Sequence, residues 1–366
     1  MIKEFVHLTN MFENMGFVYL GPVDGHNMEE LDKVLQTAKT YHHPVFIHVN
    51  TVKGKGYKFA QENPGEYHGV ACFNPKVGTK ETWKKECFSC AFGDILVKFS
   101  KSDKNICAIT AAMKYGVGLQ SFCREFPSRF FDVGIAEQHA VTFAAALAKS
   151  GKTPVFAVYA SFLQRAYDQL IHDVTLQNLH IVLAVDRFGV VGSDGETHQG
   201  TFIMNMLMGI PNVTIFTPCN YQELEEHLYK AIYEVKGIAA VCYPRGKEQL
   251  ITPLPTDKNE DTAVITYGRM YTELSQRMNN VYTCHDILYP VQESFITQFL
   301  SKKHILFIEE MYETGGYGDY FHLQLIHRGY TGTFRKKALP AIIKQAPPSF
   351  IFSSLLDTGT AVIEVP

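Results

Sequence analysis

Short apolar runs, rich in β-branched and aromatic residues, recur along the chain, and each is followed by a longer stretch with helical spacing. The runs lie at residues 45–49, 106–110, 155–159, 181–185, 213–216, 239–243, 263–267 and 305–310. Strands that are apolar on both faces and alternate with helices are typical of parallel sheets covered on both sides. We therefore predict an α/β protein built on parallel sheets.

Breaks in this pattern divide the chain into three blocks. The first block, residues 1–80, ends in a stretch rich in Gly, Pro and Asn at 61–78, which predicts a long loop or linker. The second block covers 81–250, and a polar break at 252–262 leads into a third α/β block at 258–366. The first block has room for about one strand with flanking helices, too little for an independent sheet, so we interpret it as the end of a domain.

Composition and charge narrow the class of protein. The chain has 366 residues, 46% hydrophobic and 19% charged, with a formal net charge of −3, so it offers no basic surface for nucleic acid. Residues 140–148, the longest apolar stretch, are too few to span a bilayer, and the start of the chain lacks the pattern of a signal peptide. The eight scattered cysteines indicate reduced thiols. We expect a cytoplasmic protein without a nucleic-acid or membrane partner.

Polar and aromatic side chains follow several of the predicted strands, where ligands bind in parallel sheets. They are Glu137 in the first turn of a helix, Tyr159, Phe162, Arg165, Asp186, Arg187, Asp194, His198 and Arg245. Together they predict an anion-binding site with acid–base groups along one edge of the sheet.

Each of these residues also has a structural interpretation. A glutamate in a first helical turn often only complements the helix dipole, and arginines at strand ends often cap carbonyl groups or pair with surface carboxylates. His198 could be a solvated loop residue, and Phe162 could be core packing. KGKGY at 53–57 could cradle a phosphate through Lys53 or form an exposed turn. Cys87 and Cys90 form a lone CxxC, which the start of a helix explains.

Six stretches, taken in order, resemble the 1-deoxy-D-xylulose-5-phosphate synthase family of the transketolase superfamily. They are YLGPVDGHN at 19–27, KGKGY at 53–57, FFDVGIAEQHAVTFAA at 130–145, YASFLQRAYDQLIHDV at 159–174, VDRFGVVGSDGETHQG at 185–200 and YPRG at 243–246. Two later stretches, ETGGYGD at 313–319 and LLDTG at 355–359, resemble the family more weakly. The resemblance implies a transketolase-like pyrimidine-binding domain at 81–250, a C-terminal transketolase-like domain at 258–366, and the end of a pyrophosphate-binding domain at 1–80.

The same resemblance implies thiamine diphosphate as cofactor and assigns roles to the residues. Glu137 would bind the aminopyrimidine ring and Phe162 would stack on it. Lys53 and His68 would approach the diphosphate and the reacting centre. The phosphate of glyceraldehyde 3-phosphate would be held by Tyr159, Arg165, Arg187 and Arg245, with Asp194 and His198 beside the substrate. The catalytic residues implied in this way are Glu137, His198 and His68.

The sequence departs from the family pattern in one major respect. It contains no GDG motif followed by Asn, the motif whose side chains bind the divalent metal in this family. Smaller departures are Cys242 where an arginine is usual and Glu196 where a smaller or neutral residue is usual. We therefore expect no metal ligands on this chain and place the Mg²⁺ site on a domain that these residues do not include.

The leading hypothesis is that the chain is one part of a split transferase. A GDG-bearing chain would complete it, and the complex would condense pyruvate with glyceraldehyde 3-phosphate in isoprenoid (terpenoid) and thiamine biosynthesis. Because the superfamily dimerises, we expect a homodimer, a hetero-oligomer with the GDG-bearing chain, or both.

Two alternatives remain open at the level of sequence. The β-type subunit of a 2-oxoacid dehydrogenase also lacks GDG and carries an AEQ glutamate, although KGKGY and the arginines argue against it. The second alternative is a non-catalytic or regulatory remnant that keeps the dimerising surfaces.

Overall fold

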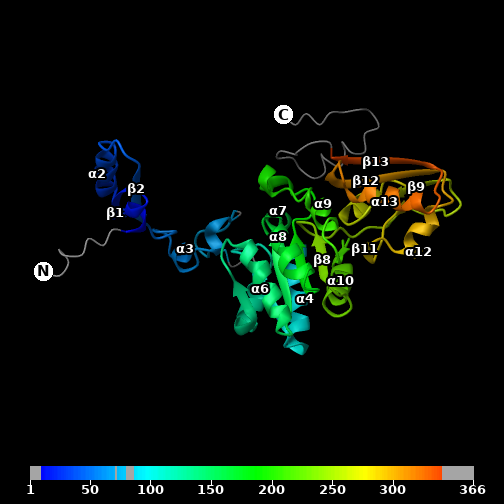
Figure 1. Ribbon diagram of the computed structural model, residues 1–366, viewed down its shortest axis with the longest axis horizontal. Coiled ribbons are helices and arrows are strands. Elements are labelled where there is room, and N and C mark those ends of the chain that lie inside the picture. The colour runs from blue at the N-terminus through cyan, green and yellow to red at the C-terminus, as the bar shows by residue number, and fades with distance from the viewer. Residues whose placement is uncertain (1–9, 71, 80–85, 340–366) are drawn as a thin grey trace. The chain divides into compact units, whose positions relative to one another are not determined.

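The computed structural model describes residues 10–70, 72–79 and 86–339 (Figure 1). The chain divides into two compact units, Met1–Lys84 and Lys85–Pro366, which are described one at a time. The LLDTG stretch at 355–359 lies outside the described residues.

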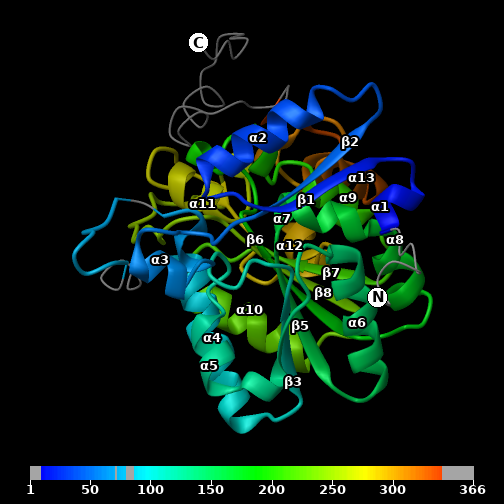
Figure 2. The ribbon, with the colours of Figure 1, turned by 90° about the vertical axis from the view of Figure 1, so that its left-hand side faces the viewer.

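The first unit contains a pair of parallel strands, β1 (Val18–Asp24) and β2 (Val45–Asn50). Helix α2 (Met28–Ala38) connects them and packs on the pair (Figure 2). The prediction of about one strand for this block is wrong, because β1 is interrupted by Gly21 and Pro22 and does not read as a continuous run. Short helices complete the unit: α1 (Met11–Asn14), α3 (Lys58–Glu62) and the 3₁₀ turn η1 (Glu66–His68).

The second unit is built around a seven-stranded sheet with the order β11-β7-β8-β6-β5-β3-β4. Its strands are β3 (Ile106–Thr110), β4 (Phe130–Asp132), β5 (Thr153–Tyr159), β6 (Ile181–Asp186), β7 (Val213–Phe216), β8 (Ile238–Tyr243) and β11 (Ile287–Tyr289). Neighbouring strands are parallel except for β11, which pairs antiparallel with β7. The predicted α/β class with parallel sheets is confirmed.

Helices cover this sheet, and every residue of its strands β6 and β8 is buried. They are α4 (Phe88–Ser102), α5 (Gln120–Glu125), α6 (Glu137–Lys149), α7 (Ala160–Leu163), α8 (Tyr167–Gln169), α9 (Ile203–Met208) and α10 (Tyr221–Tyr233). Shorter turns are η2 (Pro127–Arg129), η3 (Gln164–Ala166), the π-helical η4 (Leu170–Thr175), η5 (Gly192–Asp194) and η6 (Glu196–His198). In Figure 2 strand β5 lies between α6, which packs on it, and the layer formed by α10 and α4. Every residue of β6 is buried, as its unbroken apolar run predicts.

The end of the chain forms a second, four-stranded parallel sheet with the order β10-β9-β12-β13. Its strands are β9 (Thr262–Ile265), β10 (Val281–Tyr282), β12 (His304–Tyr312) and β13 (Thr333–Leu339), and its helices are α11 (Arg269–Leu274), α12 (Glu293–Ile296), α13 (Tyr317–His327) and η7 (Thr297–Phe299). Strand β11 comes from this part of the sequence but belongs to the seven-stranded sheet. Buried residues of the two sheets form one continuous hydrophobic core.

Candidate functional site

The register of three neighbouring strands brings their last residues side by side. Tyr159 of β5 pairs with Asp186 of β6, and Asp186 pairs with Tyr243 of β8. Because the strands are parallel, the residues that follow them also meet at this edge, as the sequence predicts for Arg187 and Arg245.

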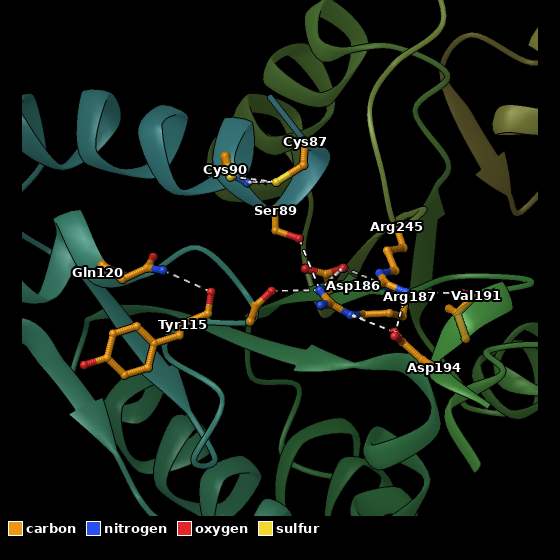
Figure 3. Close-up of polar contacts among 11 residues, drawn as sticks. Cys87, Ser89, Cys90, Tyr115, Gln120, Asp186, Arg187, Val191, Asp194 and Arg245 are labelled. Carbon is orange, nitrogen blue, oxygen red and sulfur yellow. Dashed lines mark hydrogen bonds and ion pairs between the residues drawn. The ribbon is translucent and has the colours of Figure 1, made fainter. Parts of the chain in front are cut away.

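Arg187 lies at the centre of this edge. It adopts a left-handed backbone conformation, with φ of 62°, directly after β6. Its Nη1 lies 2.9 Å from Oδ1 of Asp186 and donates to the carbonyl of Gly116 at 2.7 Å and to Oγ of Ser89 at 3.2 Å (Figure 3). Its guanidinium carbon lies 3.9 Å from the centre of the Tyr159 ring, a cation–π contact. The Nη1 side of the guanidinium is therefore fixed by the protein.

By contrast, the Nε side of the same guanidinium is not fixed by a hydrogen bond to the described residues. Arg187 Nε is buried and donates no hydrogen bond within the described residues. Asp194 Oδ2 lies 4.0 Å from it, and Asp194 Oδ1 lies 2.5 Å from Nη1 of Arg245. Two arginines thus converge on one partly exposed carboxylate, and a buried unused donor lies beside them.

The charges at this edge are close to balance. Two guanidinium groups face Asp194 and the fully buried Asp186. Burial raises the pKa of the Asp186 carboxyl, and the neighbouring Arg187 acts in the opposite direction.

An aromatic cluster lies next to the arginines. The rings of Tyr159 and Phe162 are stacked with centroids 5.6 Å apart, and the ring of His198 meets Phe162 edge-on at 5.2 Å. Burial raises the pKa of the Tyr159 hydroxyl, so this group stays a protonated donor at neutral pH. The structure therefore brings together three of the predicted site residues from β5, α7 and η6.

Glu137 is the first residue of α6, in the first turn of a helix as the sequence predicts, and only 2% of its surface is exposed. Arg165 donates from Nη1 to Oε1 of Glu137 at 2.9 Å. The guanidinium carbon of Arg165 also lies 5.0 Å from the centre of the Phe162 ring. Arg165 therefore connects the buried carboxylate to the aromatic cluster.

Two of the predicted site residues belong to the first unit. Lys53 lies in a turn that contains Gly54 and Gly56, both with positive φ, and its Nζ donates to Nδ1 of His68 at 2.7 Å. KGKGY therefore forms an exposed turn, and the structure brings Lys53 and His68 together within that unit.

Ser89 and Gly116 are site residues that the sequence did not indicate. They contact Arg187 across 98 and 71 positions of sequence. A Cβ at position 116 would lie 1.7 Å from the Tyr159 hydroxyl, so a side chain there would require the Tyr159 ring to move. Isolated Ser and Gly residues carry no local signal of such contacts.

Comparison with known proteins identifies the family. Residues 86–249 match the model described as "Transketolase, pyrimidine binding domain", and residues 1–51 match the model described as "1-deoxy-D-xylulose-5-phosphate synthase". The synthase of Clostridium tetani is 43% identical over 338 residues, which cover 87% of this chain and 54% of that protein. The chain belongs to the 1-deoxy-D-xylulose-5-phosphate synthase family. The synthase of Clostridium kluyveri is 39% identical, with coverage of 100% of this chain and 62% of that protein.

The chain therefore spans only a little more than half the length of these family members. Among solved structures, a split-gene transketolase described as an inactive beta4 tetramer has a TM-score of 0.58 at 19% identity, covering 70% of this chain and 90% of that one. The transketolase of Campylobacter jejuni has the same TM-score at 16% identity, covering 94% and 66%. These structures share the transketolase-like α/β fold. No helix within the described residues has the length and apolar character that crossing a membrane requires.

The described residues fit the two halves of the family's cofactor differently. Members of the family use thiamine diphosphate. The buried carboxylate of Glu137 and the ring of Phe162 suit an aminopyrimidine. The one group of three ligand-type side chains found among the described residues is Cys219, Glu223 and His285. Its thiol and imidazole groups do not match the oxygen ligands that Mg²⁺ takes.

Proposed function

We propose that the chain provides the pyrimidine- and acceptor-binding part of a thiamine-diphosphate-dependent transferase that condenses pyruvate with glyceraldehyde 3-phosphate. The observation that carries the proposal is the buried carboxylate of Glu137, held by Arg165 beside the Phe162 ring. Family membership supports the same function, since the relatives are 1-deoxy-D-xylulose-5-phosphate synthases.

Glu137 would act on the pyrimidine half of the cofactor. The thiazolium part of thiamine diphosphate supplies the carbanion chemistry when the cofactor is bound. The Oε atoms of Glu137, one of which pairs with Arg165, would share a proton with a pyrimidine nitrogen. Phe162 would orient the ring by stacking, and the buried surroundings would exclude water from the carboxylate.

The arginine pair would hold the phosphate of the acceptor. Arg187 offers a buried Nε donor without a partner among the described residues, and Arg245 lies on the other side of Asp194. A phosphate dianion would take the place of Asp194 between the two guanidinium groups. The Tyr159 hydroxyl, whose pKa is raised by burial, would add a neutral donor, and His198 would lie beside the substrate.

The diphosphate and Mg²⁺ would be bound by a GDG-bearing segment outside these residues, supplied by a partner chain in a hetero-oligomer. Two observations support this part of the proposal. The 366 residues contain no GDG motif, and the ligand-type cluster among the described residues suits a softer metal than Mg²⁺. The family resemblance assigns Lys53 and His68, which share a hydrogen bond within the first unit, to the diphosphate.

Reconstitution tests the proposal. The chain would be mixed with a GDG-bearing segment of a relative, thiamine diphosphate, Mg²⁺ and both substrates, and the condensation product would be followed by mass spectrometry. We expect product only in the complete mixture. Glu137→Gln should then lower turnover about 100- to 10,000-fold, the usual effect of losing a positioned acid–base group. Asp168→Asn, an exposed carboxylate on α8, is the matched control and should leave turnover unchanged.

Two results would contradict the proposal. If Glu137→Gln retained full turnover, Glu137 would only complement the dipole of α6. If the chain alone bound thiamine diphosphate with a micromolar Kd, about −8 kcal/mol, the division of the site between segments would be wrong.

Acceptor specificity gives a separate measurement. Arg187→Ala or Arg245→Ala should lower kcat/KM for glyceraldehyde 3-phosphate about 10- to 150-fold, because a charge-assisted hydrogen bond is worth about 1.5–3 kcal/mol. Unphosphorylated glyceraldehyde never makes the contact and should be affected far less. Equal losses with both acceptors would assign the two arginines to maintenance of the sheet edge.

A further inference from the structure

Two cysteines lie at the start of α4, next to the arginine edge. Cys87 is the N-cap residue, and its sulfur accepts a hydrogen bond from the backbone N–H of Cys90 at 3.3 Å. The two Sγ atoms are 2.6 Å apart, and both residues are partly exposed. A disulfide has a sulfur–sulfur distance of about 2.05 Å, so a small approach of the two side chains would join them.

The two thiols differ in acidity in the way that thiol–disulfide exchange requires. The hydrogen bond from the Cys90 thiol lowers the pKa of Cys87 to about 6, against the effect of burial, with further support from the Cys90 N–H and Arg187. The pKa of Cys90 is raised by the same hydrogen bond and by burial, and the carboxylates of Asp94 and Asp186 add to the rise. At neutral pH Cys87 is therefore a thiolate nucleophile, and Cys90 holds the proton beside it.

Ser89 connects this pair to the arginine edge. It lies between the two cysteines in sequence, and its Oγ accepts the hydrogen bond from Arg187 (Figure 3). The first turn of α4 also packs closely on the loop that contains Gly116, since a Cβ at Gly118 would lie 1.9 Å from the Ser89 carbonyl oxygen. A movement of the Cys87–Cys90 turn would therefore displace the Ser89 hydroxyl and the Gly116 carbonyl, the two groups that accept hydrogen bonds from Arg187 Nη1.

We propose that Cys87 and Cys90 are a redox-active dithiol that is oxidised by a small-molecule disulfide and that shifts the support of Arg187 when it closes. The Cys87 thiolate attacks the small disulfide, forms a mixed disulfide and releases one thiolate. Cys90 then loses its proton and attacks the Cys87 sulfur, and the second small thiolate leaves. The net reaction converts two protein thiols and one disulfide into one protein disulfide and two small thiols. This chemistry does not depend on the proposed transferase activity.

Peptide mapping tests the dithiol. The full chain would be equilibrated in buffers of glutathione and glutathione disulfide, quenched in acid, alkylated and mapped by mass spectrometry. We expect a Cys87–Cys90 disulfide that forms and reduces reversibly. Alkylation of Cys87 in the reduced chain should rise with pH around a midpoint of about 6.

Single substitutions separate the two roles. In Cys90→Ser the mixed disulfide cannot be resolved, so glutathione should accumulate on Cys87, whereas Cys87→Ser should not trap it on Cys90. Cys123→Ser, at another partly exposed thiol, is the control and should keep the Cys87–Cys90 disulfide. The proposal is overturned if both thiols stay alkylatable in the wild-type chain while the exposed Cys72 or Cys123 takes up glutathione.

Hydrogen exchange tests the link to Arg187. Oxidation should change amide exchange about threefold or more in peptides covering 112–118 and 185–190, in addition to the turn itself. In Ser89→Ala the change should be confined to residues 86–92. Unchanged exchange at 112–118 and 185–190 in the oxidised wild-type chain would overturn the link. Failure of the transferase proposal would instead appear as absent condensation, with these two measurements unaffected.

Discussion

Asp194 pairs with Arg245 at 2.5 Å and turns its other oxygen toward Nε of Arg187 at 4.0 Å. The carboxylate therefore occupies the position between the two arginines that an anionic ligand would need. Asp194 lies in a short 3₁₀ turn and not in a strand of the sheet, and its side chain is partly exposed. We infer that the carboxylate would compete with an anion for this position.

Asp194→Asn should consequently tighten the binding of inorganic phosphate. The substitution removes the competing charge, and a partly exposed ion pair is worth about 1 kcal/mol, so we expect an affinity gain of about fivefold. Titration calorimetry on the full chain measures it, with Asp168→Asn as the charge-matched control. Weaker phosphate binding in Asp194→Asn would mean that Asp194 positions the arginines instead of competing with the anion.

The pair formed by Arg165 and Glu137 predicts a stability effect. Arg165→Ala leaves a carboxylate that is 2% exposed without its guanidinium partner, so the free energy of unfolding should fall by about 1–3 kcal/mol. Urea unfolding measures the loss.

A double-mutant cycle shows whether the loss comes from this contact. In the Glu137→Gln background, Arg165→Ala should lower the unfolding free energy much less, because the buried charge is gone. Equal losses in both backgrounds would attribute the effect to the packing of Arg165 on Phe162.

The strands of the fold were predictable where burial on both faces leaves an unbroken apolar run. Ile181–Asp186 is such a strand, and all six residues are buried. Thr333–Leu339 was not predictable, because it is an edge strand with the sequence TFRKKAL, and charged residues are favoured at sheet edges. Ile287–Tyr289 was not predicted, because this three-residue strand pairs antiparallel with β7, which is distant in sequence.

The candidate site likewise contains residues that the sequence could predict and residues that it could not. Residues that follow strands, such as Arg187, could be located because parallel strands end at one edge. Ser89 and Gly116 could not, since their contacts with Arg187 arise only when α4 and the loop after β3 pack against β6. Asp194 was expected beside the substrate, and no sequence pattern indicated that it pairs with Arg245 and lies near Arg187.

Glu309 predicts a pH dependence of stability. It is fully buried in β12, accepts a hydrogen bond from the Tyr267 hydroxyl at 2.8 Å, and burial raises its pKa from 4.5 to about 7. Between pH 4.5 and 7 the folded chain therefore holds a proton that the unfolded chain has lost, so the unfolding free energy falls as pH rises through this window. The total loss is on the order of 3 kcal/mol.

The comparison with Glu309→Gln isolates this group from other titrations. The amide cannot ionise, so the unfolding free energy of the wild type relative to Glu309→Gln should decline by this amount between pH 4.5 and 7. Urea unfolding at several pH values gives the difference. A constant difference across the window would mean that Glu309 stays ionised in the folded chain, paired with Lys336.

Gly93 lies on the buried face of α4, where the helix meets the backbone of Gly118 directly. A Cβ at position 93 would lie 2.0 Å from the Gly118 carbonyl oxygen, so Gly93→Ala must push α4 away from the loop that supports Arg187. In an isolated helix, alanine is more stable than glycine by about 1 kcal/mol. Overpacking a core costs about 1–3 kcal/mol, and we expect the cost of Gly93→Ala near the upper end of this range because the contact is with backbone. We expect thermal unfolding of Gly93→Ala at a clearly lower Tm. Lys101→Ala, on the exposed side of the same helix, should leave the Tm nearly unchanged because its ion pair with Glu125 is exposed. A higher Tm for Gly93→Ala would show that helix propensity outweighs this contact and that α4 does not pack on the Gly118 backbone.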